Sequence, residues 1–202
     1  MLAVGRKSSL VGVQNMNINI DQSNNKVKVN DNLETSLENV YAVGDIIDSP
    51  QLAHVAFQEG ITAAYNAVNE DKKDIDYKAV PWCIYSTPEI ASVGLTENEV
   101  IQKDYDYDKT IYPLSANGRA VVMNETEGFI KIIKENTYDE VLGVHIIGPQ
   151  ATELISSPTL GIKLEITTDE LADNIYPHPT LSESIGEAGE MLEKGAIHYF
   201  DK

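Results

Sequence analysis

The stretch "EGFIKIIKENTYDEVLGVHIIGP", residues 127–149, contains two apolar runs on either side of a short polar segment. Both runs are rich in isoleucine and valine, which favour strands, and the polar segment between them has the composition of a turn. Strands joined by so short a connection pair in antiparallel fashion. The stretch therefore predicts a β-hairpin, and it is the clearest sign of an antiparallel sheet in the chain.

Helices are predicted near this hairpin by pairs of polar residues at the spacing of a capping box. Two such pairs are Thr96 with Glu99 and Thr167 with Glu170. Within each pair, the side chain of one residue can accept the backbone N–H of the other at a helix start. Pro158 lies inside the helical pattern "ATELISSPTLGIKLEI" and should kink or split that helix, because proline removes a hydrogen bond and crowds the preceding turn.

The last helix is expected to bury one face, formed by Ile185, Ala188, Leu192 and Ala196. Upstream of the hairpin, "VPWCIYSTPEIASVG" combines strand-forming residues with prolines, which suits an edge strand or a loop. We expect residues 80–202 to form one α+β domain, an antiparallel sheet with helices packed against it.

The first 79 residues have an α/β character. The run "NVYAVGD", 39–45, predicts a buried strand that ends at a loop, and "VKVN", 27–30, alternates as a strand does. "LAVGRKS" near the start looks like a strand end. Residues 52–69 follow as an amphipathic helix whose apolar face is Ala53, Phe57, Ile61, Ala64 and Val68. A parallel sheet needs more such units, so residues 1–79 are interpreted as a remnant of a larger region, joined by the charged segment 69–80 to the second domain.

Composition excludes several classes of protein. The chain has 202 residues, a formal net charge of −17 and a pI of about 4.4, so its average field repels nucleic acid and anionic lipid. Its apolar runs are all too short to span a membrane, and the N-terminus lacks a basic-then-apolar signal segment. A cytoplasmic protein with neither nucleic-acid nor membrane partners is expected.

Metal and thiol chemistry have little support in the sequence. Cys83 is the single cysteine, which excludes an internal disulfide, and it is interpreted as a small buried hydrophobe. Histidines 54, 145, 178 and 198 lack Cys or acidic neighbours at metal-ligand spacing, so no metal site is predicted. For His145 and His198, structural or exposed roles suffice.

The stretch "YPHPTLSE", residues 176–183, allows two interpretations. Thr180 and Glu183 fit a third capping box, which makes the stretch a helix start. Alternatively His178 is a general base whose tautomer and basicity are set by the carboxylate of Glu183. The helix start and the general base are compatible interpretations, because a helix start flanked by prolines is a rigid support for an imidazole.

An ordered set of motifs carries a family resemblance over essentially all 202 residues. "NVYAVGD" with "QLAHVAFQEG", then "VPWCIYSTPEIASVGLTE", then "ANGRA" with "GFIKII", then "LGVHIIGPQATELI" and "HPTLSE" together resemble the C-terminal part of the flavoprotein disulfide reductases, in the dihydrolipoyl dehydrogenase branch. The resemblance implies FAD and NAD as cofactors. It also implies an oxidoreductase that reoxidises dihydrolipoyl groups on a lipoyl-bearing protein of a 2-oxo-acid dehydrogenase or glycine-cleavage complex.

The resemblance also assigns roles to particular residues. Asp45 resembles the acidic residue that binds the ribityl hydroxyls of the flavin, with Gly44 allowing a close approach, and the backbone amide of Ala53 resembles the group that meets the flavin ring. His178 resembles the acid/base of the family and Glu183 its orienting carboxylate. In the family this histidine serves the disulfide of the other subunit, so residues 80–202 resemble the interface domain of a homodimer.

Several family motifs have no counterpart in the chain. These are the G-x-G-x-x-G for FAD, the C-x-x-x-x-C redox disulfide and nearly all of the NAD domain, of which "LAVGRK" resembles the last strand. The FAD site is thus incomplete, and we expect the chain to be a fragment or a part of a longer enzyme that is inactive alone. Two alternatives stay open: a folded dimerisation module without catalysis, and a related enzyme similar to glutathione reductase.

Overall fold

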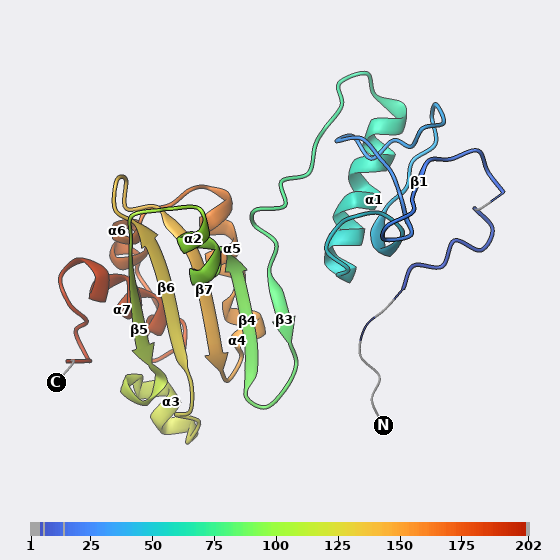
Figure 1. Ribbon diagram of the computed structural model, residues 1–202. Coiled ribbons are helices and arrows are strands. Elements are labelled where there is room, and N and C mark those ends of the chain that lie inside the picture. Colours follow the sequence, from blue (N-terminus) through green and yellow to red (C-terminus); the bar gives the residue numbers. More distant parts are fainter. Residues whose placement is uncertain (1–4, 6, 14, 201–202) are drawn as a thin grey trace. The chain divides into compact units, whose positions relative to one another are not determined.

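The computed structural model of the protein describes residues 5, 7–13 and 15–200 (Figure 1). The chain divides into two compact units, residues 1–76 and 77–202. Each unit has its own buried apolar cluster.

The predicted hairpin is confirmed as β6 (Phe129–Glu135) and β7 (Val141–Gly148), which pair in antiparallel register with one irregularity between Ile133 and Lys134. Three further strands complete an antiparallel sheet in the order β3-β4-β7-β6-β5. They are β3 (Trp82–Ile84), β4 (Glu89–Gly94) and β5 (Tyr107–Pro113). The segment beginning at Val80 thus supplies β3, an edge strand as expected, and β4.

Two helices of the second unit begin where the sequence predicts. Thr96 caps α2 (Glu97–Gln102) and Thr167 caps α6 (Thr168–Asp173), each in a complete capping box. The remaining elements are η2 (Leu114–Ala116), α3 (Gly118–Met123), α4 (Ala151–Leu154), α5 (Ser156–Lys163) and α7 (Glu183–Glu193).

Pro158 splits its helix, as expected. The break falls at Ile155, between α4 and α5, and Pro158 lies in the first turn of α5. Proline is tolerated in a first turn because the amide that it lacks has no partner within the helix there.

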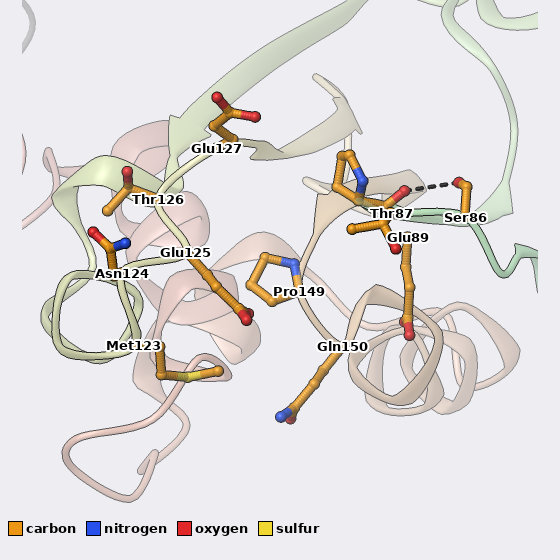
Figure 2. Close-up of a pocket in the computed structure, with 11 residues that line it drawn as sticks. Ser86, Thr87, Glu89, Met123, Asn124, Glu125, Thr126, Glu127, Pro149 and Gln150 are labelled. Atoms are coloured by element: carbon orange, nitrogen blue, oxygen red, sulfur yellow. Dashed lines mark hydrogen bonds between the residues drawn. The ribbon is translucent and has the colours of Figure 1, made fainter.

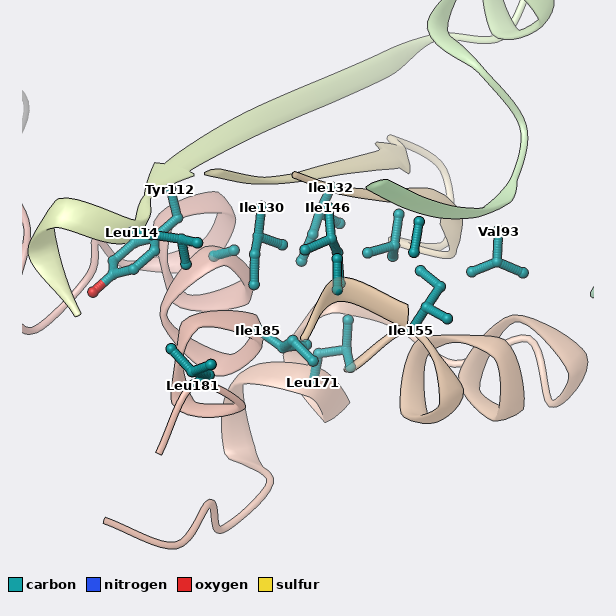
Figure 3. Close-up of a cluster of buried hydrophobic side chains, with 14 of the residues drawn as sticks. Val93, Tyr112, Leu114, Ile130, Ile132, Ile146, Ile155, Leu171, Leu181 and Ile185 are labelled. Carbon is teal, nitrogen blue, oxygen red and sulfur yellow. The ribbon is translucent and has the colours of Figure 1, made fainter. Parts of the chain in front are cut away.

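The main core lies between one face of the sheet and α4 to α7 (Figure 3). Ile130, Ile132 and Ile146 point from the strands toward Ile155, between α4 and α5, and toward Ile185 on α7. On the other face of the sheet, α2 packs Val100 against Ile133 and Leu142 in a separate small cluster. The second unit therefore has the predicted fold class, an antiparallel sheet with helices packed against it.

The buried face of α7 follows the predicted pattern with one difference. Ile185 and Ala188 are fully buried and Leu192 is partly buried. The helix ends at Glu193, before Gly195 with its positive φ of 92°, so Ala196 is buried from the segment after the helix.

The first unit has little sheet. It contains the two-residue strands β1 (Ile20–Asp21) and β2 (Lys26–Val27), then η1 (Gly44–Ile46) and α1 (Ala53–Val68). Of the predicted strand 27–30, only Val27 lies in a strand, and the "LAVGRKS" strand end falls mainly on residues 1–4 and 6, outside the described residues.

The strand predicted at residues 39–45 is wrong. In this segment, all of which the structure describes, Tyr41 makes one isolated bridge to Glu34, and Gly44 already lies in η1. A strand is stabilised by hydrogen bonds to neighbouring strands. This apolar run pairs with the short segment 33–35, through the Thr35 N–H to the Val40 carbonyl and the Ala42 N–H to the Leu33 carbonyl, and that pairing does not extend into a strand.

Helix α1 is confirmed at 53–68, but the face predicted to be buried is exposed. Phe57, Ile61 and Val68 have 71%, 66% and 82% of their surface exposed. Ala53 and Ala64 of the same face are also exposed. The helix instead buries Val55, Glu59, Thr62, Ala63 and Asn66.

Polar contacts explain why α1 buries its less apolar face. The carboxylate of Glu59 accepts the N–H of Gly44, and the amide of Asn66 donates to the carbonyls of Asn32 and Lys73 at 3.0 and 2.8 Å. Buried polar groups are tolerated when they are hydrogen-bonded in this way. The apolar stripe on the opposite side of α1 faces outward in this chain.

Candidate functional site

His178 and Glu183 lie side by side at the start of α7. Nδ1 of His178 is 2.7 Å from Oε1 of Glu183, and the histidine side chain is 73% exposed while that of the glutamate is 21% exposed. His178 is held between Pro177 and Pro179 in the loop that leads into the helix. The structure thus brings together the two residues that one interpretation of the sequence makes a general base and its carboxylate.

The carboxylate of Glu183 is held at both oxygens. Oε2 accepts the backbone N–H of Thr180 at 2.6 Å while Oε1 binds His178. Burial raises the pKa of Glu183, but hydrogen bonds from Thr180 and His178 and the charges of His178 and His198 outweigh this, so the pKa lies below its usual value. Glu183 is therefore an ionised acceptor in a fixed position.

The third capping box is only half formed. Glu183 accepts the N–H of Thr180 as the box requires, but the Thr180 hydroxyl donates to the carbonyl of Pro177 at 2.7 Å. Helix α7 begins at Glu183, preceded by Ser182, so Thr180 lies too far upstream to cap it. The prediction of a Thr180 cap is wrong because the hydroxyl is engaged inside the loop.

This arrangement suits proton transfer at His178. An ionised carboxylate only accepts hydrogen bonds, so the proton of a neutral His178 lies on Nδ1 and Nε2 is left as the basic nitrogen. The exposed ring can then take a proton from a donor outside this chain.

Gly44 has a clear packing role within the first unit. Its φ is +71°, and a Cβ at this position would lie 3.2 Å from the Cβ of Ala56 on α1. Any other residue would thus be strained in conformation and crowded by the helix. Gly44 also donates its N–H to the buried carboxylate of Glu59, a contact with no signal in the sequence.

Asp45 and Ala53 are both exposed on the surface of the same unit. The Asp45 side chain is exposed, and its backbone carbonyl accepts hydrogen bonds from Ser8 and from Lys26, at 2.5 and 2.7 Å. Ala53 is the first residue of α1 and follows Leu52, whose apolar side chain cannot cap the helix. A helix N-terminus carries partial positive charge and free amides, which suit an electron-rich group.

These residues fit part of a flavin. A carboxylate can bind hydroxyl groups and the α1 N-terminus can face the electron-rich edge of a ring, whereas the sequence contains no Gly-rich loop for a pyrophosphate. Gly44, Asp45 and Ala53 could therefore hold the sugar alcohol and ring of FAD but not its phosphates.

A second histidine–carboxylate pair was missed by sequence reasoning. Nδ1 of His198 lies 2.7 Å from Oε1 of Glu187, and the backbone N–H of His198 donates to Oε2 at 3.1 Å. The one available signal was the spacing of Glu187, four residues after Glu183 and hence on the same side of the helix.

A cavity of about 690 Å³ opens among three loops of the second unit (Figure 2). Its lining includes three carboxylates, Glu89, Glu125 and Glu127, and none of the five predicted site residues. Glu89 is already engaged at the start of α4, where it accepts from the N–H and hydroxyl of Thr152 at 3.0 and 2.7 Å.

The other candidate residues have structural surroundings. His145 lies in β7 with Nε2 3.1 Å from the carbonyl of Leu95, and burial lowers its pKa. Cys83 packs half-buried against the core, and burial together with the charges of Glu89 and Glu153 raises its pKa. Among the described residues, no group of three or more His, Cys, Asp or Glu is placed to hold a metal ion, and no helix is long and apolar enough to cross a bilayer.

Comparison with known families accounts for both units. Residues 80–189 match the family described as pyridine nucleotide-disulphide oxidoreductase, dimerisation domain, and residues 1–60 match pyridine nucleotide-disulphide oxidoreductase. The chain belongs to this family. The antiparallel second unit is thus a dimerisation domain, and it is preceded by part of the oxidoreductase domain.

Members of this oxidoreductase family from several organisms are similar along the whole chain. A dihydrolipoyl dehydrogenase of Bacillus subtilis is 41% identical over 98% of this chain and 42% of its own length. A dihydrolipoyl dehydrogenase of Thermus scotoductus is 40% identical over 100% of this chain and 44% of its own length. The chain therefore spans less than half the length of these relatives.

Solved structures agree with the sequence comparisons. LpdA of Mycobacterium tuberculosis matches with a TM-score of 0.82 at 30% identity, covering 90% of this chain and 39% of that one. The HOCl-induced flavoprotein disulfide reductase RclA of Escherichia coli matches with a TM-score of 0.88 at 26% identity, covering 95% and 44%.

Proposed function

We propose that this chain is part of a dihydrolipoyl dehydrogenase and supplies its acid/base histidine and its dimer interface. The enzyme would oxidise dihydrolipoyl groups on a lipoyl-bearing protein of a 2-oxo-acid dehydrogenase or glycine-cleavage complex, with NAD as the final acceptor. The exposed pair of His178 and Glu183 carries the proposal, because it combines a basic nitrogen open to a substrate with a carboxylate fixed behind it.

His178 acts on the thiols of the dihydrolipoyl group. Nε2 takes a proton from one thiol, and the resulting thiolate is the nucleophile that a disulfide requires. The positive charge then carried by the imidazole is balanced by Glu183, 2.7 Å from Nδ1. Because Glu183 is also bound to the Thr180 N–H, it holds the ring in one orientation throughout.

FAD and the redox disulfide would belong largely to parts of the enzyme outside this chain. When bound, FAD carries the electrons from the disulfide to NAD. In this chain Asp45 would bind its ribityl hydroxyls, the amide of Ala53 would meet the ring, and Gly44 keeps the turn close to α1.

A homodimer is part of the proposal. The match of residues 80–189 to a dimerisation domain supports it. Within such a dimer, His178 of one subunit would serve the disulfide of the other, as the resemblance implies.

The proposal is tested in a chimera in which residues 1–202 replace the matched segment of the Bacillus subtilis relative. The unsubstituted chimera should reduce NAD with dihydrolipoamide. Glu183→Gln should lower this turnover about 10²-fold, because the neutral amide no longer holds and balances the imidazole. Stability should change little, since the glutamine oxygen can still accept the Thr180 N–H.

Glu170→Gln is the matched control, because Glu170 is also a carboxylate at a helix start and accepts the N–H of Thr167 at 2.8 Å. It should leave turnover unchanged. If Glu183→Gln leaves both turnover and stability unchanged, "HPTLSE" is only a helix start and the catalytic role is wrong.

A further inference from the structure

The pair formed by Glu187 and His198 repeats the geometry of the proposed catalytic pair. In each, one carboxylate oxygen lies 2.7 Å from a histidine Nδ1 and the other oxygen accepts a backbone N–H. Both carboxylates belong to α7, one helical turn apart. The two histidines approach the helix from opposite sides in the sequence, one before it and one after it.

The two carboxylates are close enough to affect each other. Residues four apart on a helix have neighbouring side chains, and like charges at this spacing are unfavourable. Both also act on the buried hydroxyl of Tyr112 in β5: burial, followed by the charges of Glu187 and Glu183, raises the pKa of Tyr112. Glu183 and Glu187 thus share one electrostatic environment.

The segment after α7 holds His198 in this environment. Ala196 is buried, and the ring of Tyr199 meets that of Tyr112 edge-on, with centroids 6.0 Å apart and planes at 72°. His198 is therefore fixed between two packed residues, with its ring and its backbone N–H both directed to Glu187.

Other charged groups around α7 are engaged elsewhere. On β6, Lys134 contacts Asp139 and, at 3.4 Å, Glu193 at the far end of the helix. Next to α6, Lys194 lies 3.7 Å from Asp173. Among the described residues, the groups shown to act on the two carboxylates are Tyr112 from β5, His178 from the preceding loop, and His198.

We propose that Glu187 and His198 are positioning residues for the proposed acid/base pair: His198, when protonated, compensates the charge of the Glu187 carboxylate that it contacts, so that Glu183 keeps its own charge for His178. This inference rests on the proposed function only for its consequence in catalysis. Burial raises the pKa of Glu183, and the charge of His198 acts with the hydrogen bonds from Thr180 and His178 to hold that pKa below its usual value.

The test uses the complete 202-residue chain and follows the side-chain carboxyl carbon of Glu183 by NMR as the pH is lowered. His198→Ala should raise the pKa of Glu183 by about half a pH unit or more, because an uncompensated carboxylate then lies one turn away. His198→Asn should give the same rise, since its amide can still donate to Glu187 but carries no charge. Lys194→Ala, which removes the ion pair of the same segment with Asp173, should leave the pKa of Glu183 unchanged.

Each outcome decides the proposal. The proposal is supported if the pKa of Glu183 rises in both His198 variants and does not change in Lys194→Ala. A rise in His198→Ala alone would show that the residue is a structural anchor, and no rise in either variant, with the chain folded, would show that the pairs are independent; both overturn the proposal. The measurement needs neither flavin nor substrate, so it can succeed or fail separately from the turnover test of Glu183.

Discussion

At the level of single residues, Glu97 shows how one carboxylate can tie a helix to a sheet. It begins α2 and contacts the ammonium groups of Lys109 on β5 and Lys131 on β6, with the Tyr107 hydroxyl 3.1 Å away. Hydrogen bonds from Lys109 and Lys131 are the main cause that lowers the pKa of Glu97 to about 2. The side chain is 23% exposed, so solvent screens part of this interaction.

The lowered pKa predicts a pH dependence of stability. A carboxyl whose pKa is depressed on folding stabilises the protein above its unfolded pKa, and this contribution is lost as the pH falls through the folded value. For Glu97 the window is from about pH 5 down to about pH 2. In Glu97→Gln, the free energy of unfolding measured by urea titration should therefore fall less steeply across this window than in the parent chain.

The control for this prediction is Glu125→Gln, which alters an exposed carboxylate of the same unit. Its pH dependence should follow that of the parent chain. Equal slopes in Glu97→Gln and the parent would show that the contacts with the two lysines contribute nothing to stability.

At the level of elements, α1 shows that a sequence pattern can predict a helix correctly and still give the wrong buried face. Its amphipathic pattern predicts the helix correctly, yet Val55 is 4% exposed while Ile61 is 66% exposed. The face with Glu59 and Asn66 is buried because the loops around it supply hydrogen-bond partners for those polar groups.

Opposite substitutions on the two faces of α1 test this orientation. Val55→Ala should lower the free energy of unfolding of the first unit by about 1–3 kcal/mol, because it removes buried methyl groups. Ile61→Gln should change it by no more than about 0.5 kcal/mol, as surface substitutions usually do. A urea titration followed at the amide signals of residues 53–68 measures the free energy of unfolding in both variants. If Ile61→Gln lowers it more than Val55→Ala does, the face predicted from the sequence is the buried one.

At the level of the whole molecule, the two units differ in how much core they have. In the second unit the buried cluster extends from β4 and β5 through the hairpin to α7, whereas in the first it consists of Leu10, Val27, Leu33, Ile47 and Ala63. The larger cluster should give the second unit the greater resistance to local opening.

Amide hydrogen exchange on the 202-residue chain without flavin measures this difference. Amides of β6 and β7 should exchange slowest, because these strands lie inside the sheet and carry core side chains on one face. Amides of the described residues in the first unit should exchange faster, and those of the exposed segment 70–72 fastest. Uniformly fast exchange across residues 127–149 would contradict a core that is stable without cofactor.

The sequence by itself determined those features that depend on contacts within a few residues. The hairpin at 127–149, the capping boxes at Thr96 and Thr167 and the split near Pro158 arise from strand propensity, neighbouring side chains and a missing amide. The pairing of His178 with Glu183 belongs to this group, because the two are five positions apart around a proline-bounded turn.

Only the tertiary structure decided the features that need a partner from elsewhere in the chain. The run at 39–45 is apolar enough for a strand but forms one only beside other strands, and an apolar stripe on α1 is buried only where another surface covers it. The Thr180 hydroxyl donates to the Pro177 carbonyl and does not cap α7. The carboxylate of Glu187 binds the ring of His198, which comes from the segment after the helix. A hydrogen bond or a buried face depends on which groups meet in space, and local spacing in the sequence does not contain that information.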